Sequence, residues 1–399
     1  MSSVAVDVVV VGGGIQGLVL VRELSAQGYA CVLVTRGPLG GAQTLHSHGA
    51  LISGMGLVTG ALAETVDRHT APYLRRWGVS VETQLPGFLV IPDGMAADLA
   101  PAWQSYGYRP ERTDPGSLPG FEPGASPYRV PTANIDKRRL VEGLARGLEA
   151  RVVQGEVVHT EGELHVRTAG GQTLRLRARA VVLAAGCGTK ELLDRTFDVE
   201  GRLAARITYS KLHILCLRAP AGVLPAFGAV VSPDLLVIGH RQDDGRGAAA
   251  ASTWYVTPVD PMATPHPRAP DDAVADVEPR VVALAVQGLR RLFPVLRHDD
   301  ERVQATVFAG YKQDLDGEQL GRACELVDAD RNLMVVLPSV LANAVPNAHD
   351  CVAVLRERVE PSGQTTDMPG AGGVAVGAPY EDSGLPWQAW GALARAAGR

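Results

Sequence analysis

The start of the chain alternates between strand-like and helical hydrophobic patterns. Residues 4–11 form a mostly β-branched apolar run, which suits a strand buried on both faces. After a glycine-rich turn, Ile15, Leu18 and Leu24 recur at helical spacing, and residues 29–35 form a second apolar run. The pattern therefore predicts a βαβ unit of about 30 residues at the start of the chain.

The rest of the chain divides into helical, strand-rich and irregular segments. Apolar residues at helical spacing predict helices within residues 64–77, 134–150 and 273–292. Other apolar runs predict a β-meander at 151–180, a strand entering a glycine turn at 180–186, strand-rich segments at 206–259 and 302–311, and a buried strand at 332–337. Turn-forming composition predicts short strands and loops at 86–130, and an irregular tail at 361–399 with a short helix at 385–397.

These segments predict an α/β fold of two domains that are interleaved along the chain. The opening βαβ unit and the last buried strand are expected in one Rossmann-like domain, and the β-rich middle in an inserted antiparallel-sheet domain that binds substrate. The Rossmann-like domain is assigned residues 1–80, 131–205 and 320–360, the inserted domain residues 81–130 and 206–319, and the irregular tail residues 361–399.

Composition narrows the class of protein. The 399-residue chain is 46% hydrophobic and 20% charged, as in ordinary globular proteins. Its net charge of −5, without a long basic run, argues against nucleic acid as a partner. The sequence lacks an apolar stretch of about 18 residues and an N-terminal signal pattern, so we expect a cytoplasmic protein without a membrane span. The 5 cysteines form no Cys-x-x-Cys pair, which favours buried free thiols over a metal site.

The turn after the first strand has the spacing of a dinucleotide-binding motif. Gly12, Gly14 and Gly17 match G-x-G-x-x-G between a predicted strand and a predicted helix. In this motif the glycines allow a tight turn, close approach to a pyrophosphate and close helix packing. The helix that Ile15 and Gln16 open would direct its positive end at the phosphates. The motif therefore predicts a dinucleotide cofactor.

Three segments resemble the D-amino-acid oxidase, glycine oxidase and sarcosine oxidase superfamily of FAD-dependent oxidoreductases. They are GAQTLHSHGALISG at residues 41–54, AVVLAAGCG at residues 180–188 and NLMVVLPSVLANAVPNAHDCVAVL at residues 332–355. The resemblance extends over residues 4–356 and implies FAD as the cofactor. The cofactor-binding residues that the glycine motif and the resemblance imply are Gly12, Gly14, Ile15, Gln16, Gly17, Thr35, Arg36, Gln43, Thr44, His46, Gly49, Val157, Ala185, Gly186, Ser339, Val340 and Leu341.

Two positions depart from that family's pattern. Where the family has a carboxylate at the end of the second strand, this chain has Thr35 followed by Arg36, and the arginine leaves NADP open as an alternative cofactor. Where the family has glycines near its last strand, this chain has PSVLAN at residues 338–343. A helix N-terminus there would still stabilise negative charge on the flavin ring.

Candidate catalytic residues come from the β-rich segments. In the family an arginine late in the β-rich domain binds the substrate carboxylate, and Lys312 takes its place here, beside Tyr311. Lysine lacks the two-pronged geometry of arginine, so a bulkier substrate or one that is not an amino acid is a further possibility. In the alternating run ITYSKLHILCLR, His213 and Lys211 share one face of a strand, and His213 is a further candidate.

The two histidines of TLHSHG carry the most specific prediction. Some family members attach FAD covalently through a histidine in a TWHAAG-like motif, and His46 and Gly49 match its histidine and glycine. His46 is therefore expected beside the flavin, either covalently bonded to it or in contact only, with a simple loop role as the alternative. His48 is a candidate for substrate contact or for a general base.

The resemblance implies oxidation of a small molecule at a C–N bond, in an amine or amino acid, by hydride transfer to flavin N5. Oxygen or another acceptor would then take up the electrons. Gln43, Thr44 and His46 also resemble a QTxHxSGxI pattern of the L-2-hydroxyglutarate dehydrogenase group, so oxidation of a 2-hydroxy acid stays open. A flavin-binding protein without redox turnover is the third possibility.

Overall fold

The structure is a computed structural model of the full chain, and its description covers most residues. The described residues are 3–51, 65–79, 81–82, 85–105, 107, 109–115, 120, 125–130, 133–160, 163–168, 170–197, 199, 202–243, 249–259, 264–266, 277–316, 322–338, 340–364, 368, 371 and 373–398.

The first sheet contains the predicted βαβ unit and orders its strands around a parallel core. Its strands are β1 (Ser3–Val11), β2 (Cys31–Thr35), β9 (Val152–Thr160), β10 (Glu163–Thr168), β11 (Thr173–Leu183), β18 (Arg322–Asp328) and β19 (Leu333–Pro338). β1 lies between β2 and β11, and β11 pairs in turn with β19; all three pairings are parallel. The carboxyl ends of these strands therefore meet at one edge of the sheet, where ligands bind in open α/β folds.

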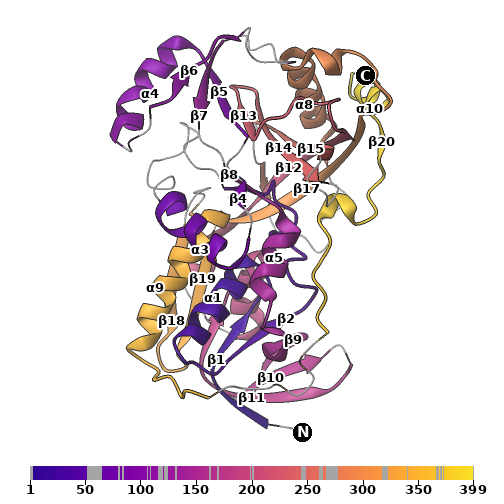
Figure 1. The fold of residues 1–399 in the computed structure, drawn as a ribbon. Helices are drawn as coiled ribbons and strands as arrows, with labels where there is room; N and C mark the ends of the chain where they lie inside the picture. Colours follow the sequence, from indigo (N-terminus) through magenta and orange to yellow (C-terminus); the bar gives the residue numbers. More distant parts are fainter. Residues whose placement is uncertain are drawn as a thin grey trace.

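Helices cover one face of this sheet, as Figure 1 shows for α1 (Ile15–Ala26), α5 (Lys137–Ala145) and α9 (Ala344–Arg356). Their apolar residues share one core with Val8, Val10 and Leu33 of the strands. On the opposite face the sheet folds back on itself, so that Val9 and Val34 share a core with side chains of β9, β10 and β11 and with the segment that contains α6 (Thr189–Glu191) and α7 (Arg202–Arg206).

The second sheet is mostly antiparallel. Its strands are β5 (Gly87–Ile91), β6 (Glu111–Arg112), β7 (Ser126–Val130), β12 (Ile207–Pro220), β13 (Ala229–Val231), β14 (Leu235–Asp243), β15 (Ala249–Pro258), β16 (Thr264–His266), β17 (Gln304–Leu315) and β20 (Gln388–Ala389). β12 and β17 pair along almost their whole length, from Ile207 opposite Leu315 to Arg218 opposite Gln304. The mixed α/β architecture, with a Rossmann-like sheet and a second, β-rich sheet, confirms the predicted fold class.

The two faces of the second sheet have different neighbours. On the outer face, Leu217 and Trp254 pack against α8 (Pro279–Leu292) and α10 (Trp390–Ala397). On the inner face, Ile214 and Tyr255 belong to a separate core to which α4 (Asp93–Ser105) contributes. The sequence predicts only short strands and loops around α4, because Pro101 inside the helix interrupts the helical signal.

A small sheet connects the two large ones. It contains β3 (Ala50–Leu51), β8 (Ala133–Ile135) and β4 (Val81–Glu82), and α3 (Ala71–Arg76) precedes β4 in the chain. The amide of Asn134 in β8 donates to the carbonyl groups of Gly228, at 2.9 Å, and Gly239, at 2.6 Å, in the second sheet.

The C-terminal segment crosses the molecule from one large sheet to the other (Figure 1). We call the described residues between 361 and 389 the strap. The Ser362 hydroxyl donates to Asp7 in the middle of β1, and Gly377 N donates to Leu39 O at 2.8 Å. The strap then ends as β20 against β17, and α10 follows at Trp390. The sequence predicts an irregular tail with a short helix at 385–397; the helix begins five residues later.

Candidate functional site

The glycine turn after β1 has no room for side chains. Gly12 has φ +126°, and a Cβ atom there would lie 2.3 Å from the carbonyl oxygen of Ala184. A Cβ atom on Gly17 would lie 1.9 Å from the Gly12 carbonyl oxygen. Both positions therefore require glycine, because β1, β11 and α1 meet there at backbone-to-backbone distance.

The N-terminus of α1 is free of negative side chains. Gly14 caps the helix without a side-chain hydrogen bond, and the first turn has no acidic residue. The Ile15 N–H is held by Thr44 Oγ1 at 3.0 Å, which ties the helix to the loop after β2. Gln16 is buried, with Nε2 donating to Ala344 O at 3.1 Å while Oε1 has no hydrogen-bond partner in the protein. A buried orphan acceptor at the positive end of a helix fits a site that is completed by a bound ligand.

Other residues implied as cofactor ligands lie at the same edge. Gln43 Oε1 accepts from the Cys187 N–H at 3.1 Å, and a Cβ atom on Gly186 would lie 2.3 Å from that oxygen. The turn after β11 is thereby joined to the loop after β2. After β19, Val340 and Leu341 lead through a short turn into α9. These contacts bring the ends of β1, β2, β11 and β19 together, and the residues fit a dinucleotide.

Four positions add detail or fall outside this group. Thr35 is buried, and its hydroxyl donates to Gly37 O at 2.9 Å, whereas Arg36 is exposed. Val157 packs its side chain into the core, so only its backbone is available to a cofactor. Ser339 lies outside the described residues.

The loop that carries the two histidines lies between the sheets. His46 is half-buried, and its carbonyl oxygen would lie 3.3 Å from a Cβ atom on Gly310 of β17. His48 Nε2 lies 2.6 Å from Thr257 Oγ1, and His48 O accepts from His240 Nε2 at 2.8 Å. The loop is thus held against the inner face of the second sheet.

Both imidazoles are neutral at physiological pH. Loss of hydration lowers the pKa of His46 to about 4, and the charge of Lys137 acts in the same direction. Burial, Lys137 and His240 lower the pKa of His48 to about 4. A neutral imidazole keeps a lone pair that can accept a proton.

The inner face also carries Lys312, two residues from Gly310 on β17. Lys312 Nζ lies 3.0 Å from Asp314 Oδ1; the lysine side chain is 14% exposed and the aspartate 2%. Asp314 also accepts a hydrogen bond from Ser210. The lysine charge is therefore partly compensated inside the protein, and the lysine is the member of the pair that a ligand can reach.

The structure separates the other two catalytic candidates from this group. His213 and Tyr311 lie on the face opposite to Lys312, because side chains alternate along β12 and β17. His213 Nε2 lies 3.4 Å from Glu278 Oε1, and Lys211 lies at the same distance from that oxygen. Since Glu278 caps α8, this cluster belongs to the outer side of the sheet.

Several residues at the His48 loop are absent from the sequence-based list. They are Lys137, His240, Tyr255, Thr257 and Glu381, which surround His48 and Gly49. The sequence places Lys137 directly after Asp136, the N-cap of α5, but nothing in its neighbours along the chain marks the lysine as buried.

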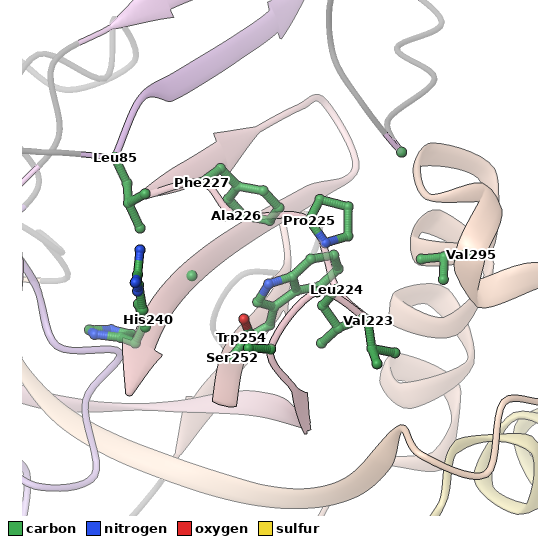
Figure 2. A pocket seen from close by; sticks show the side chains of 15 residues that line it. Leu85, Val223, Leu224, Pro225, Ala226, Phe227, His240, Ser252, Trp254 and Val295 are labelled. Carbon is green, nitrogen blue, oxygen red and sulfur yellow. The ribbon is translucent and has the colours of Figure 1, made fainter. Parts of the chain in front are cut away.

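A cavity of about 510 Å³ lies elsewhere, at the end of β14. Figure 2 shows Phe227, Trp254, Pro225 and Leu224 along one side of it and His240 at the other. Its walls are mainly outer-face residues, so it is separate from the edge where the parallel strands end. In the part of the chain that the structure describes, no group of three or more His, Cys, Asp or Glu side chains is placed to hold a metal ion, and no helix is long and apolar enough to cross a membrane.

The sheet edge, the glycine turn and the orphan acceptor define a dinucleotide-binding fold. Residues 7–337 match the model of the FAD dependent oxidoreductase family DAO, and the chain belongs to this family. It is 31% identical over 324 residues to the FAD-dependent oxidoreductase PA4991 of Pseudomonas aeruginosa, an alignment that covers 73% of this chain and 76% of that protein. The chain is thus an FAD-dependent oxidoreductase, as predicted.

Solved structures show the same fold. The crystal structure of PA4991 superposes with a TM-score of 0.68 and 22% identity over 96% of this chain and 99% of that chain. Glycine oxidase from Geobacillus kaustophilus gives a TM-score of 0.63 and 18% identity over 94% of this chain and 100% of that one. NikD, an amino acid oxidase of nikkomycin biosynthesis, gives a TM-score of 0.68 and 16% identity over 90% of this chain and 95% of that one.

Proposed function

We propose that this enzyme oxidises a small molecule at a C–N bond, in an amine or an amino acid. When bound, FAD supplies the acceptor for a hydride at N5, and oxygen or another acceptor takes the electrons onward. The observation that carries the proposal is that a cation, Lys312, and a neutral imidazole, His48, both lie at the inner face of the second sheet, Lys312 on β17 and His48 against Thr257 of β15. Glycine oxidase and the amino acid oxidase NikD, which share the fold, support the choice of bond.

The two side chains have separate roles in this proposal. Lys312 orients an anionic group of the substrate through a point charge. Because Asp314 already holds that charge at 3.0 Å, the substrate anion shares the lysine with the aspartate and binds less tightly than it would at a free cation. His48, neutral and held by Thr257, faces the substrate or accepts a proton from it.

A second candidate function is oxidation of a 2-hydroxy acid. Removing a hydride from an alcohol carbon requires that the hydroxyl proton also leaves, so a base is needed. His48 is unprotonated at neutral pH, as a base must be, and this observation favours the candidate; its pKa of about 4 makes it a weak base, so the candidate stands second.

An anaerobic substrate screen tests the choice. The purified yellow protein is mixed with amines, amino acids and 2-hydroxy acids, and bleaching of the visible flavin band is recorded. We expect bleaching by a compound with an oxidisable C–N bond; bleaching by hydroxy acids alone would support the second candidate. If no compound reduces the flavin while dithionite does, the protein is a flavin-binding protein without turnover.

A pair of lysine variants tests the role of Lys312. With the substrate that the screen finds, Lys312→Met is expected to lower the second-order rate constant of flavin reduction about 10- to 100-fold, the loss typical of a charged hydrogen bond. Lys190→Met is the control, because Lys190 forms an exposed ion pair with Asp194. Equal rates in both variants would contradict the role of Lys312.

We also propose that His46 bears FAD covalently. Its neutral imidazole carries the lone pair that such a bond requires. The bond would join an imidazole nitrogen to the 8α-methyl carbon as one N–H and one C–H bond break, and the two protons and two electrons released would pass to the electron acceptor. Acid precipitation should leave the yellow colour with the wild-type protein and release it from His46→Ala. Free flavin in the wild-type supernatant would disprove the link.

A further inference from the structure

Lys137 is a lysine buried where the small sheet, the second sheet and the strap meet. Its side chain is 4% exposed, and Nζ lies 3.1 Å from a carboxylate oxygen of Glu381, whose side chain is 3% exposed. Nζ also lies 4.4 Å from the centre of the Tyr255 ring, and the Tyr255 hydroxyl donates to Glu381. A buried ion pair generally stabilises a protein no better than apolar side chains of the same volume. Its presence here therefore points to a role other than stability.

The ion pair lies directly behind the loop of His48 and Gly49. A Cβ atom on Gly49 would lie 3.0 Å from Lys137 Cγ, and Ile135 N donates to Gly49 O at 2.7 Å. The ring of Tyr255 meets the ring of His240 edge-on, with centroids 5.4 Å apart, and His240 in turn holds the His48 carbonyl. Lys137 thus packs directly beside the loop, and Glu381 reaches it through Tyr255 and then His240.

We propose that Lys137, paired with Glu381 and stacked on Tyr255, is a positioning residue for His48. Its side chain fixes the backbone at Gly49, and its charge sets the electrostatic environment of the His48 imidazole. Glu381 makes the burial of that charge possible and is supplied by the strap. The inference rests on the proposed function in that His48 faces the substrate.

The groups around His48 support the electrostatic part. Charged or titratable side chains approach this region from α5, from three strands of the second sheet and from the strap. They are Asp136, Lys137, Cys216, Arg218, His240, Tyr255, Glu381 and Asp382. Arg218 is paired with Asp382 at 2.8 Å, which balances both charges. Of all these charges, that of Lys137 is the one that lowers the pKa of His46, His48 and His240 alike.

Three variants separate charge from packing. Lys137→Met removes the cation with little change in volume, Glu381→Gln removes the anion, and the double variant removes both. Lys190→Met is the control for loss of an exposed lysine. The readouts are the melting temperature of the full-length holoprotein and the titration of the His48 ring between pH 3 and 7, a range that includes the wild-type midpoint of about 4. The titration is followed by NMR with ¹⁵N-histidine, and the signal is assigned by its loss in His48→Gln.

The expected results differ between the variants. Each single variant should lower the melting temperature by about 5 to 10 °C, because one charge is left buried without its partner, and the double variant should recover part of that loss. The midpoint of His48 should rise by about one pH unit, a tenfold change in protonation, in both variants that lack Lys137. Glu381→Gln and Lys190→Met should not raise it.

Two outcomes would overturn the proposal. An unchanged His48 midpoint in the double variant would show that Lys137 does not act on the imidazole, even if Lys137→Met alone fails to fold. An equal rise in Glu381→Gln would show that breakage of the pair, rather than the lysine charge, is what matters. Neither readout uses substrate turnover, so the inference can fail while the proposed function holds, and the reverse.

Discussion

Single residues decide where a cofactor can approach the backbone. At Gly12 and Gly17 the restriction is steric, since any Cβ atom would overlap a carbonyl oxygen at 2.3 Å and 1.9 Å. At Gln16 and Thr44 hydrogen bonds fix the backbone instead. The Gln16 side chain connects the start of α1 to α9, and the Thr44 side chain connects it to the loop after β2.

Gly12→Ala is expected to abolish FAD binding and to destabilise the first sheet, because the extra methyl group forces β1 and β11 apart. Its φ of +126° adds backbone strain for alanine. The flavin content per protein, measured by absorbance after purification, should fall to near zero. Gly37→Ala is the matched control, because nothing lies within 4 Å of a Cβ atom there. A Gly12→Ala protein with full flavin content would contradict this account.

At the scale of elements, the sequence predicts what local patterns can encode. The βαβ unit, the helix that Asp136 caps and the strand before Pro338 follow from hydrophobic period and capping residues. Local patterns do not predict which face of the second sheet His213 of β12 and Lys312 of β17 occupy. Side chains alternate along each strand, but the two residues can be assigned to opposite faces only once the pairing of β12 with β17 is known. The Lys137–Glu381 pair joins residues 244 positions apart, and no local pattern reports such a contact.

The helix α10 contributes to the stability of the second sheet, although its short, alanine-rich sequence does not indicate this. Trp390 is fully buried in the outer core, and its Nε1 donates to Leu296 O at 2.9 Å. Trp390→Ala should cost about 3 to 5 kcal/mol of unfolding free energy through the cavity that it leaves. Chemical denaturation followed by circular dichroism measures this loss. Trp387→Ala, at a half-buried site over Arg218, should cost clearly less; equal losses would count against the packing argument.

At the scale of the whole molecule, the two sheets meet through polar contacts. The His48 loop, Asn134 and the Lys137–Glu381 pair all lie between the first and second sheets, and the strap passes both. The junction is therefore sensitive to protonation, whereas the apolar cores on either side are not.

The pH dependence of stability follows from three imidazoles at this junction. The pKa values of His46, His48 and His240 are each lowered to about 4 by burial, while an unfolded histidine titrates near pH 6.5. Between these values the unfolded chain binds more protons than the folded one, so stability falls as the pH decreases from about 6.5 to 4. Melting curves recorded across that range should show a steady decrease. A His48→Gln/His240→Gln variant should show a smaller slope, and an identical slope would contradict the assignment.

The strap has a consequence for the order in which the molecule is made. A nascent chain emerges with its N-terminus first, so β1, α5 and most of the second sheet are complete before residue 381 leaves the ribosome. Until then Lys137 has no carboxylate to accompany it into the interior. The closing of the junction between the sheets, and with it the final seating of the His48 loop, is therefore a late event of biosynthesis.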